Sequence, residues 1–400
     1  MKILVINSGS SSIKFQLLNM KTQELLCKGL IERIGLNDSI FTYEPKDGEK
    51  IKKILDIKDH VIGLENAMKM ITDEKVGVIK SIDEIKAVGH RIVHGADKIL
   101  DSVNLTAENI KTVEACVPLA PLHNPANLMG VEAMKKLLPN VIHVGVFDTA
   151  FHSTMPQESY IYAIPYEMYE KHGIRRFGFH GTSHKYVAMK AAEKLNIPFD
   201  KFNCITVHLG NGSSLTAVKN GKSVDTTLGY GTMCGVPMGT RAGDIDPAIV
   251  LHMLDNLGLS TKEVNNILYK KSGLLGLSGI SSDMRDIELK IKEGNERAKL
   301  ALDVFAHQVA KNILALAANL DKIDAIIFTA GIGENGYEAR EVIAKRLSVF
   351  GIKIDNEKNK IRGEYGIISK EDSQVKLMVV PTNEELMIAL DTKRIFEEAK

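Results

Sequence analysis

Three short segments rich in glycine and serine have the composition of bends that bind phosphate. The first is residues 9–11 (GSS), the second is residues 212–214 (GSS), and the third is residues 330–336 (AGIGENG). Because glycine has no Cβ atom, the backbone N–H groups of such bends can come close to a phosphate oxygen. None of the three fits G-x-x-x-x-G-K-[ST], which excludes a P-loop. Together they predict a cradle for a polyphosphate.

The first two bends each join two apolar runs. Residues 3–17 read ILVINSGSSSIKFQL and residues 205–218 read ITVHLGNGSSLTAV, so each predicts a strand, a turn and a second strand. Two such hairpins about 200 residues apart indicate a duplicated domain. Glycine–serine turns are also common between strands of unrelated proteins, which leaves coincidence as the alternative.

The third bend follows a predicted strand over residues 324–329 and precedes a stretch with helical spacing. It also fits G-x-G-x-x-G, and Asp355 lies 19 residues beyond Gly336, so a nicotinamide dinucleotide site is an alternative. However, the bend lies near the C-terminus, so little of the sequence remains for the rest of a dinucleotide-binding fold. A nicotinamide site also does not explain the two hairpins.

Strands alternate with helical stretches along most of the chain, which predicts an α/β fold. Residues 40–80 are polar and lysine-rich, and they predict a peripheral hairpin and helix. After a strand over residues 375–380, Thr382 and Glu385 fit a capping box, which predicts a helix that continues to about Ala399.

The composition is that of an ordinary globular protein. Its 51 basic and 50 acidic residues give a net charge of +1, so neither nucleic acid nor a membrane is expected as a partner. The apolar run at the N-terminus is too short for a signal peptide, and no run reaches the length that spans a bilayer. The four cysteines are scattered without metal spacing, which predicts reduced thiols and a cytoplasmic location: Cys27, Cys116, Cys204 and Cys234.

Ten motifs in fixed order carry a resemblance to a known family. They are NSGSSSIKF (7–15), GHRIVHG (89–95), PLAPLHNP (118–125), FDTAFH (147–152), RRFGFHGTSH (175–184), HLGNGSS (208–214), MGTRAGDIDP (238–247), SSDMRD (281–286), AGIGENG (330–336) and NEE (383–385). With these motifs the chain resembles the acetate kinase family of the sugar kinase/Hsc70/actin superfamily over nearly its whole length.

The resemblance implies a fold of two duplicated RNase H-like domains, also called actin-like ATPase domains, with a nucleotide cleft between them. The N-terminal domain would cover residues 1–150 and be completed by a C-terminal helix over 384–400. The nucleotide-binding domain would cover residues 151–383. The resemblance also implies a homodimer that uses ATP, with Mg²⁺ as the metal and Mn²⁺ as a substitute.

The resemblance further assigns roles to individual residues. Asn7 and Glu384 would hold the metal, which prefers oxygen ligands. Arg91 and Arg241 would hold the substrate carboxylate and the transferring phosphoryl group, because a guanidinium presents a planar fork of donors. His180 would bind the phosphoryl oxygens. Asp148 is a proton acceptor in families of this kind, but acetate is already ionised at neutral pH, so orienting Arg91 or a metal-bound water is the better physical role.

Two further groups follow from the resemblance. The residues expected to bind ATP are Lys14, His208, Leu209, Gly210, Asn211, Gly212, Asp283, Met284, Arg285, Gly331, Ile332, Gly333, Glu334 and Asn335. The residues expected to bind the acyl substrate, besides Arg91, are Val93, Leu122, Phe179 and Thr232. Thr232 stands where many relatives have a proline, so the preferred acyl chain length stays open.

The expected reaction is the reversible transfer of the γ-phosphoryl group of ATP to acetate, which gives acetyl phosphate and ADP. Propionate or butyrate is the alternative acceptor within the family, since one methylene changes binding by only about 1–3 kcal/mol. An ATPase of the Hsc70/actin type is the alternative from another class. It would share the phosphate hairpins without needing Arg91, Asp148, His180 and Arg241 together.

Overall fold

The computed structural model describes all 400 residues. The chain forms two compact units, of which the first contains Met1–Ser153 with Asn383–Lys400 and the second contains Thr154–Thr382. The C-terminal segment therefore belongs to the unit that begins the chain. Each unit is described by itself below.

The first unit contains eight strands and four α-helices. The strands are β1 (Lys2–Ser8), β2 (Ser12–Asn19), β3 (Glu24–Glu32), β4 (Ser39–Pro45), β5 (Ile51–Leu55), β6 (Ile85–Ile92), β7 (Val103–Asn104) and β8 (Ile142–Phe147). The helices are α1 (His60–Ile71), α2 (Ala107–Ala115), α3 (Asn124–Leu137) and α14 (Glu384–Glu398), with short 3₁₀ turns η1 (Ile82–Glu84), η2 (Val117–Leu119) and η3 (Ala150–Thr154) near them. The predicted peripheral hairpin and helix are β4, β5 and α1.

These strands form one sheet with the order β5-β4-β3-β2-β1-β6-β8-β7. Strands β1 and β2 pair antiparallel as the predicted hairpin, while β1, β6 and β8 run parallel. Parallel neighbours end at the same edge of a sheet, so the residues at the ends of β1, β6 and β8 lie side by side.

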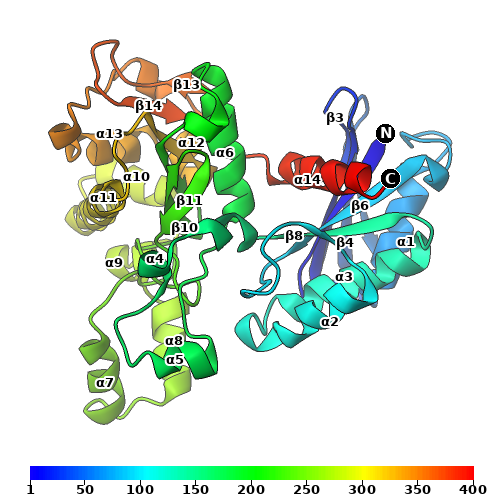
Figure 1. Cartoon of the computed structure of the whole chain (residues 1–400), viewed down its shortest axis with the longest axis horizontal. Helices are drawn as coiled ribbons and strands as arrows, with labels where there is room; N and C mark the ends of the chain where they lie inside the picture. The colour runs from blue at the N-terminus through cyan, green and yellow to red at the C-terminus, as the bar shows by residue number, and fades with distance from the viewer. The chain divides into compact units, whose positions relative to one another are not determined.

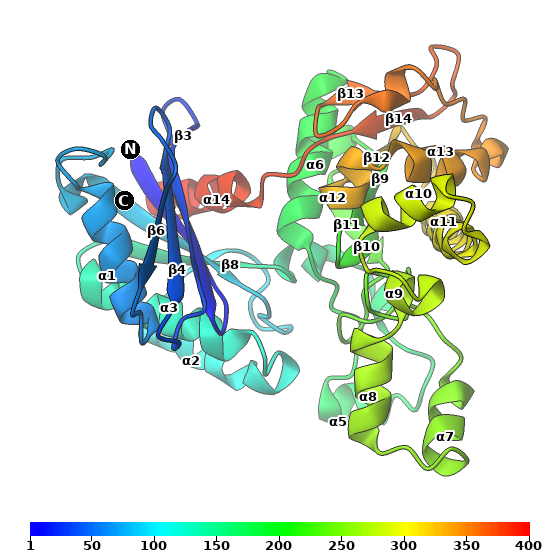
Figure 2. The same ribbon diagram turned by 180° about the vertical axis from the view of Figure 1, so that it is seen from behind.

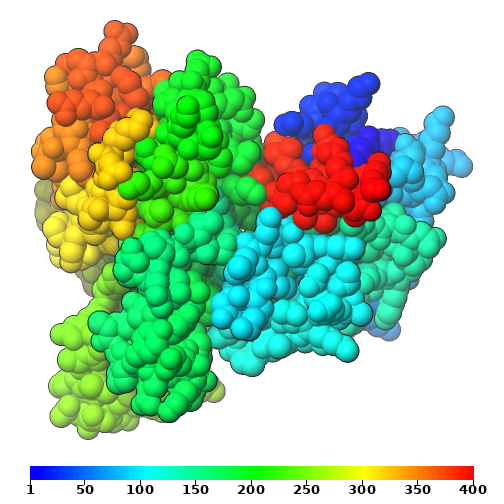
Figure 3. Space-filling view, in the orientation of Figure 1, coloured from blue at the N-terminus to red at the C-terminus, as the bar shows by residue number.

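Helices cover both faces of this sheet. Val88 packs with Ala133 and Met134 of α3, whereas a Cβ on its neighbour Gly89 would collide with Thr392 and Ile388 of α14. Successive residues of a strand point to opposite faces, so α3 and α14 lie on opposite sides. Figures 1 and 2 both show α14 against β6, and Figure 3 shows the C-terminal residues in red beside the cyan segment of the same unit.

The second unit contains six strands and ten α-helices. The strands are β9 (Cys204–Leu209), β10 (Ser213–Lys219), β11 (Lys222–Thr226), β12 (Ala325–Thr329), β13 (Gly366–Ile367) and β14 (Lys376–Val379). The helices are α4 (Gln157–Tyr160), α5 (Glu167–His172), α6 (Gly181–Lys194), α7 (Pro247–Asp255), α8 (Thr261–Lys270), α9 (Gly273–Ser278), α10 (Met284–Lys292), α11 (Glu296–Ala317), α12 (Ala330–Asn335) and α13 (Tyr337–Lys345), with 3₁₀ turns η4 (Phe199–Lys201), η5 (Ser348–Phe350) and η6 (Lys358–Lys360).

The second sheet repeats the pattern of the first. Its order is β11-β10-β9-β12-β14-β13, and the first five strands match β3-β2-β1-β6-β8 in both order and direction. The two predicted hairpins, β1–β2 and β9–β10, occupy the same place in the two sheets. The expected duplicated α/β fold is therefore confirmed.

Two local predictions differ from the structure. Residues 330–335 form the short helix α12 and not an open bend. The capping box of Thr382 with Glu385 is wrong, because Asn383 caps α14 by accepting a hydrogen bond from the Leu386 N–H at 2.9 Å. The Thr382 hydroxyl instead lies 2.8 Å from Ser183 Oγ within the second unit.

One helix, α11, is long and apolar enough by length and composition to cross a membrane. Its buried residues, which include Phe305, Val309 and Ile313, belong to the main core of the second unit together with strands β9, β10 and β12. This packing explains its hydrophobicity, because the same pattern is typical of a core helix.

Candidate active site

In the first unit, the hairpin β1–β2 places Asn7 and Lys14 opposite each other. Asn7 is half-buried near the end of β1, and Lys14 is exposed on β2. The bend between them is held by a hydrogen bond from the Gly9 N–H to the Ser12 carbonyl at 2.8 Å and by His60 Nε2, which lies 2.7 Å from the Gly9 carbonyl oxygen.

Arg91 and Asp148 form an ion pair at the ends of parallel strands β6 and β8. Arg91 Nε donates to Asp148 Oδ1 at 3.0 Å and Nη2 donates to Oδ2 at 2.7 Å. The Asp148 N–H donates to the Ile92 carbonyl at 3.0 Å, which fixes the carboxylate relative to β6. The negative charge of Asp148 raises the pKa of Arg91. The guanidinium is therefore permanently charged and held in one plane.

Glu384 is the first residue of α14 and lies among charges of both signs. Burial raises its pKa to about 7; the charge of Arg91 opposes this shift, while Asp148 and Glu385 add to it. These carboxylates repel one another, and a bound cation would relieve that repulsion. The carboxylate oxygens of Glu384 and the amide oxygen of Asn7 are hard donors of the kind that Mg²⁺ prefers, so their chemistry fits this metal.

In the second unit, His180 directly precedes helix α6 and has the left-handed conformation, with φ of 56°. Its Nδ1 lies 2.8 Å from Ser214 Oγ, and the same hydroxyl lies 2.7 Å from His184 Nε2. The His180 ring stacks on the ring of His208, with centroids 4.4 Å apart and planes inclined by 16°. His208 Nδ1 in turn lies 2.8 Å from Ser183 Oγ. The imidazole of His180 is thus fixed by a serine and a second ring.

Arg241 lies beside the second hairpin bend. A Cβ placed on Gly212 would be 3.5 Å from the His180 ring and 3.7 Å from Arg241 Nη1, so both side chains border this glycine. Arg241 Nη1 donates to the Thr232 carbonyl at 2.9 Å, and partial burial lowers the pKa of Arg241. Its other donors remain available to an anion that comes to the bend.

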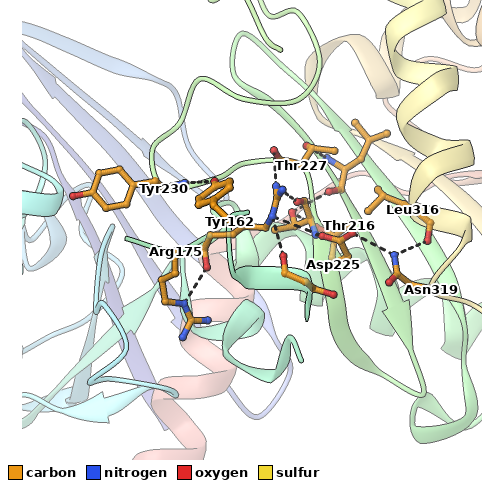
Figure 4. A network of polar contacts seen from close by, with 12 residues as sticks. Tyr162, Arg175, Thr216, Asp225, Thr227, Tyr230, Leu316 and Asn319 are labelled. Carbon is orange, nitrogen blue, oxygen red and sulfur yellow. Dashed lines mark hydrogen bonds and ion pairs between the residues drawn. The ribbon is translucent and has the colours of Figure 1, made fainter. Parts of the chain in front are cut away.

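Arg176 connects the segment that carries His180 to the sheet. Its Nη1 donates to the Thr226 carbonyl at 2.7 Å, and its Nε donates to the Ser159 carbonyl at 3.2 Å. Figure 4 shows the surrounding contacts, in which Asp225 accepts a hydrogen bond from Asn319 at 3.2 Å. These hydrogen bonds fix Arg176 against the end of β11.

A cavity of about 640 Å³ lies within the second unit, and Gly210 and Asn211, which directly precede Gly212, are among the residues that line it. The residues that line it are Gly210, Asn211, Ser282, Asp283, Met284, Arg285, Glu288, Gly331, Ile332, Asn335, Gly336 and Arg362. Eight of them were expected to bind ATP from the sequence: Gly210, Asn211, Asp283, Met284, Arg285, Gly331, Ile332 and Asn335. The cavity has the volume of a site for a nucleotide-sized ligand.

Glu334 and Gly333 were also expected to bind ATP, but they are not among the residues that line the cavity. Both instead form hydrogen bonds within the protein. Glu334 Oε1 accepts hydrogen bonds from the backbone N–H groups of Ala330 at 2.8 Å and Thr382 at 3.0 Å. The carbonyl of Gly333 accepts a hydrogen bond from the buried Arg340 at 2.9 Å. The side chain of Leu209 is fully buried in the core, so only its backbone can face a ligand.

The residues expected to bind the acyl group differ in exposure. Val93 and Phe179 are buried, Thr232 is half-buried, and Leu122 is 79% exposed in the turn before α3. The Val93 N–H donates to Asn127 Oδ1 at 3.1 Å, which positions the segment after β6. The placement of these four side chains around one substrate stays a prediction.

Four residues that line the cavity were not among those expected to bind ATP: Ser282, Glu288, Gly336 and Arg362. Of these, only Gly336 lies in one of the three predicted phosphate-binding bends. Glu288 stands one helical turn after Met284 on α10, so the spacing of a helix could have indicated it. Arg362 lies in the segment after η6, and no local pattern connects it with the other residues.

Comparisons with known proteins show the family to which the chain belongs. A family model described as the Acetokinase family matches residues 2–390. The chain is 54% identical to the acetate kinase of Caldanaerobacter subterraneus subsp. tengcongensis over 401 residues, with 100% of both chains covered. The crystal structure of Porphyromonas gingivalis acetate kinase superposes with a TM-score of 0.95 at 48% identity and covers 98% of this chain and 99% of its own.

A propionate kinase from Francisella tularensis subsp. tularensis is also similar, with a TM-score of 0.91 at 42% identity and coverage of 98% of this chain and 99% of its own. Both the match to the family model and the identity extend over nearly the whole chain. The chain belongs to the acetokinase family.

Proposed function

We propose that this chain is an ATP-dependent kinase that phosphorylates acetate reversibly, giving acetyl phosphate and ADP. Membership of the family supports this reaction, and the charged groups found in each unit suit it. The observation that carries the proposal is the meeting of His180 and Arg241 at Gly212, directly after the cavity-lining residues Gly210 and Asn211. A nucleotide in the cavity would have its terminal phosphate next to an imidazole and a guanidinium.

In the proposed reaction, a carboxylate oxygen of acetate attacks the γ-phosphorus of ATP in line. The bond from this phosphorus to the β–γ bridging oxygen breaks, and ADP leaves with the electron pair. Arg241 and His180 stabilise the charge that spreads over the phosphoryl oxygens, and no covalent enzyme intermediate is needed. Arg91, held by Asp148, is the group that binds the acetate carboxylate.

The metal proposed for this reaction is Mg²⁺, for which Mn²⁺ would substitute. Asn7 and Glu384 would hold it, with Asp148 and Glu385 adding negative charge nearby. When bound, the ion would neutralise part of the charge of the nucleotide phosphates. Lys14, opposite Asn7, is proposed to interact with the same phosphates.

A hydroxamate assay tests the proposed function. The protein is incubated with ATP, Mg²⁺ and hydroxylamine, with acetate, propionate or butyrate in parallel. Acyl hydroxamate formed fastest with acetate is the expected result. A clear preference for propionate would identify the alternative acceptor, and ATP hydrolysis without acyl hydroxamate would favour an ATPase of the Hsc70/actin type.

Arg241→Ala provides the matching test of the site. Removing one stabilising donor costs about 10²–10³ in kcat, so kcat/KM for acetate should fall at least a hundredfold while the protein stays folded. Lys270→Ala is a suitable control, because Lys270 is exposed at the end of α8 and is not part of the proposed site. Nearly full turnover of a folded Arg241→Ala protein would contradict the assignment.

We also propose that the protein is a cytoplasmic homodimer. All four cysteines are free thiols, which suits a reducing compartment. Helix α7 and the turn after it expose Ile249, Leu251 and Leu257, with 43%, 60% and 60% of their surfaces accessible, and a second copy could cover them. Light scattering after size exclusion should give twice the chain mass of 44.0 kDa. A monomeric mass would contradict the dimer.

A further inference from the structure

A buried carboxyl group in the cavity has no role in the reaction described above. Glu288 on α10 is 8% exposed, lines the cavity, and its Oε1 has no hydrogen-bond partner in the protein. A buried carboxyl oxygen without a partner costs free energy, since it has lost water and gained nothing in return. Such a group is therefore expected to bind part of a ligand.

The neighbouring charged groups are already paired with other partners. Arg285 Nη2 lies 2.6 Å from Asp283 Oδ2, at the start of the same helix. Glu338 on α13 is the carboxylate whose charge acts most on Glu288, and it forms ion pairs with Lys292 at 3.3 Å and Arg362 at 3.7 Å. No cation is left to pair closely with Glu288, although it is near several charges: Asp283, Lys292, Glu338, Arg340 and Arg362.

The position of Glu288 indicates which part of a nucleotide it faces. The phosphates belong at the end of the cavity where Gly210 and Asn211 lead to Gly212 and Arg241. A carboxylate would repel phosphate, so Glu288 suits the part of the ligand that carries no charge. A nucleobase carries hydrogen-bond donors on its edge that a carboxyl group recognises.

We propose that Glu288 selects the nucleobase, its carboxyl group hydrogen-bonding to the Watson–Crick edge of a purine. The inference rests on the nucleotide site proposed above and names the residue that sets its base specificity. The proposal predicts a choice between adenine and guanine that depends on the protonation of one side chain.

The two protonation states of a carboxyl group suit different bases. A neutral carboxyl group donates its proton to N1 of adenine and accepts a hydrogen bond from the N6 amino group. An ionised carboxylate accepts from both N1–H and the N2 amino group of guanine, which has no acceptor between them. Burial, with the charge of Glu338, raises the pKa of Glu288 to about 7. Adenine should therefore be preferred below neutral pH, and guanine should bind relatively better above it.

Binding of ADP and GDP by calorimetry between pH 6 and pH 8.5 tests this inference. The ratio of their dissociation constants cancels the titration of the phosphates, which both ligands share. For the wild-type protein, the preference for ADP should fall about tenfold over this range, as expected for a bidentate pair worth about 1–3 kcal/mol. Glu288→Gln has an amide that donates to N1 and accepts from N6, so its preference for ADP should stay high at every pH.

Two further variants make the test specific. Glu338→Gln removes the charge that opposes ionisation of Glu288, so the pH at which the preference changes should fall. Arg362→Gln removes a favourable charge and should move this pH upward. Glu293→Gln, an exposed change just after the same helix, should behave like the wild-type protein.

A preference for ADP that does not change with pH in the wild-type protein would overturn the inference. So would a Glu288→Gln protein that still titrates, or one that loses ADP and GDP equally, as expected for a contact to ribose. If wild-type protein formed acetyl hydroxamate and bound ADP in any of these cases, the proposed function would stand and only the role of Glu288 would fail. Absence of ADP binding would overturn the nucleotide site itself, and this inference with it.

Discussion

Asp148 holds the guanidinium of Arg91 through two hydrogen bonds, from Nε at 3.0 Å and from Nη2 at 2.7 Å. Both carboxylate oxygens are engaged in this pair, and the residue is 2% exposed. A carboxylate that accepts two hydrogen bonds from one guanidinium holds that group in a single plane and orientation. The pair therefore favours a role for Asp148 in orienting Arg91.

Asp148→Asn tests this role. The amide keeps one acceptor for Arg91 but loses the charge and the second hydrogen bond, so kcat/KM for acetate should fall about a hundredfold, comparable to the loss of one oriented donor. The shape of the pH–rate profile should not change. Asp97→Asn, at an exposed aspartate of the same unit, serves as the control. Loss of an ionisation from the profile of Asp148→Asn would show instead that Asp148 accepts a proton.

Gly239→Ala should weaken nucleotide binding. A Cβ at this position would collide with Asn211 Oδ1, and the Gly239 N–H also donates to the Asn211 carbonyl at 3.1 Å. Asn211 lines the cavity, so its displacement should raise KM for ATP about tenfold, with a smaller effect on KM for acetate. Gly231→Ala is the control, because its Cβ would meet only the Tyr269 hydroxyl at an ordinary 3.5 Å. Equal effects of both substitutions on KM for ATP would contradict the argument.

Three buried histidines should make the first unit sensitive to acid. Burial lowers the pKa of all three: His90, His143 and His94. The charge of His143 adds to the shift of His90, and the pKa of His94 falls to about 4. These groups stay neutral in the folded chain and take up protons when it unfolds, so protonation favours unfolding. Stability should be lost as pH falls below about 6.5, the value for an unfolded histidine.

Urea unfolding at pH 7.5 and pH 5.5 measures this effect. The free energy of unfolding should be smaller at pH 5.5 than at pH 7.5, and His94 alone should account for about 1 kcal/mol of the difference. His90→Gln keeps a polar side chain near His143 Nδ1, which lies 3.0 Å from His90 Nε2, and it should make the dependence on pH smaller. If the free energy of unfolding changed by the same amount between pH 7.5 and pH 5.5 in His90→Gln and in the wild-type protein, His90 would be ruled out as a contributor.

Arg340→Met should destabilise the second unit. The guanidinium of Arg340 is fully buried and donates hydrogen bonds to Asn359 and to the carbonyls of Gly333, Asn359 and Ile361. Burial lowers the pKa of Arg340 to about 10. Removing these hydrogen bonds should reduce the free energy of unfolding by about 3 kcal/mol. Arg346→Met is the control, at a partly exposed arginine just after α13, the helix that contains Arg340. It should reduce the free energy of unfolding by less than about 1 kcal/mol.

The sequence predicted the two hairpins and their duplication because alternating apolar residues and glycine bends are local features. It misplaced the cap of α14 because Thr382 and Asn383 are both good capping residues. What decides between them is the contact of Thr382 with Ser183, nearly two hundred positions away, which no local pattern contains. Glu288 was missed for a similar reason: the groups that line the cavity with it, such as Gly210 and Arg362, lie more than seventy positions away along the chain.

The place of α14 has a consequence for how the protein is made. The face of the first sheet that α14 covers is formed by strands β1, β6 and β8, which emerge from the ribosome early. This apolar face has no cover until the whole second unit has been translated. The domain that is synthesised first is thus the last to be completed, and during that interval it depends on chaperones or on its own partial stability to avoid aggregation.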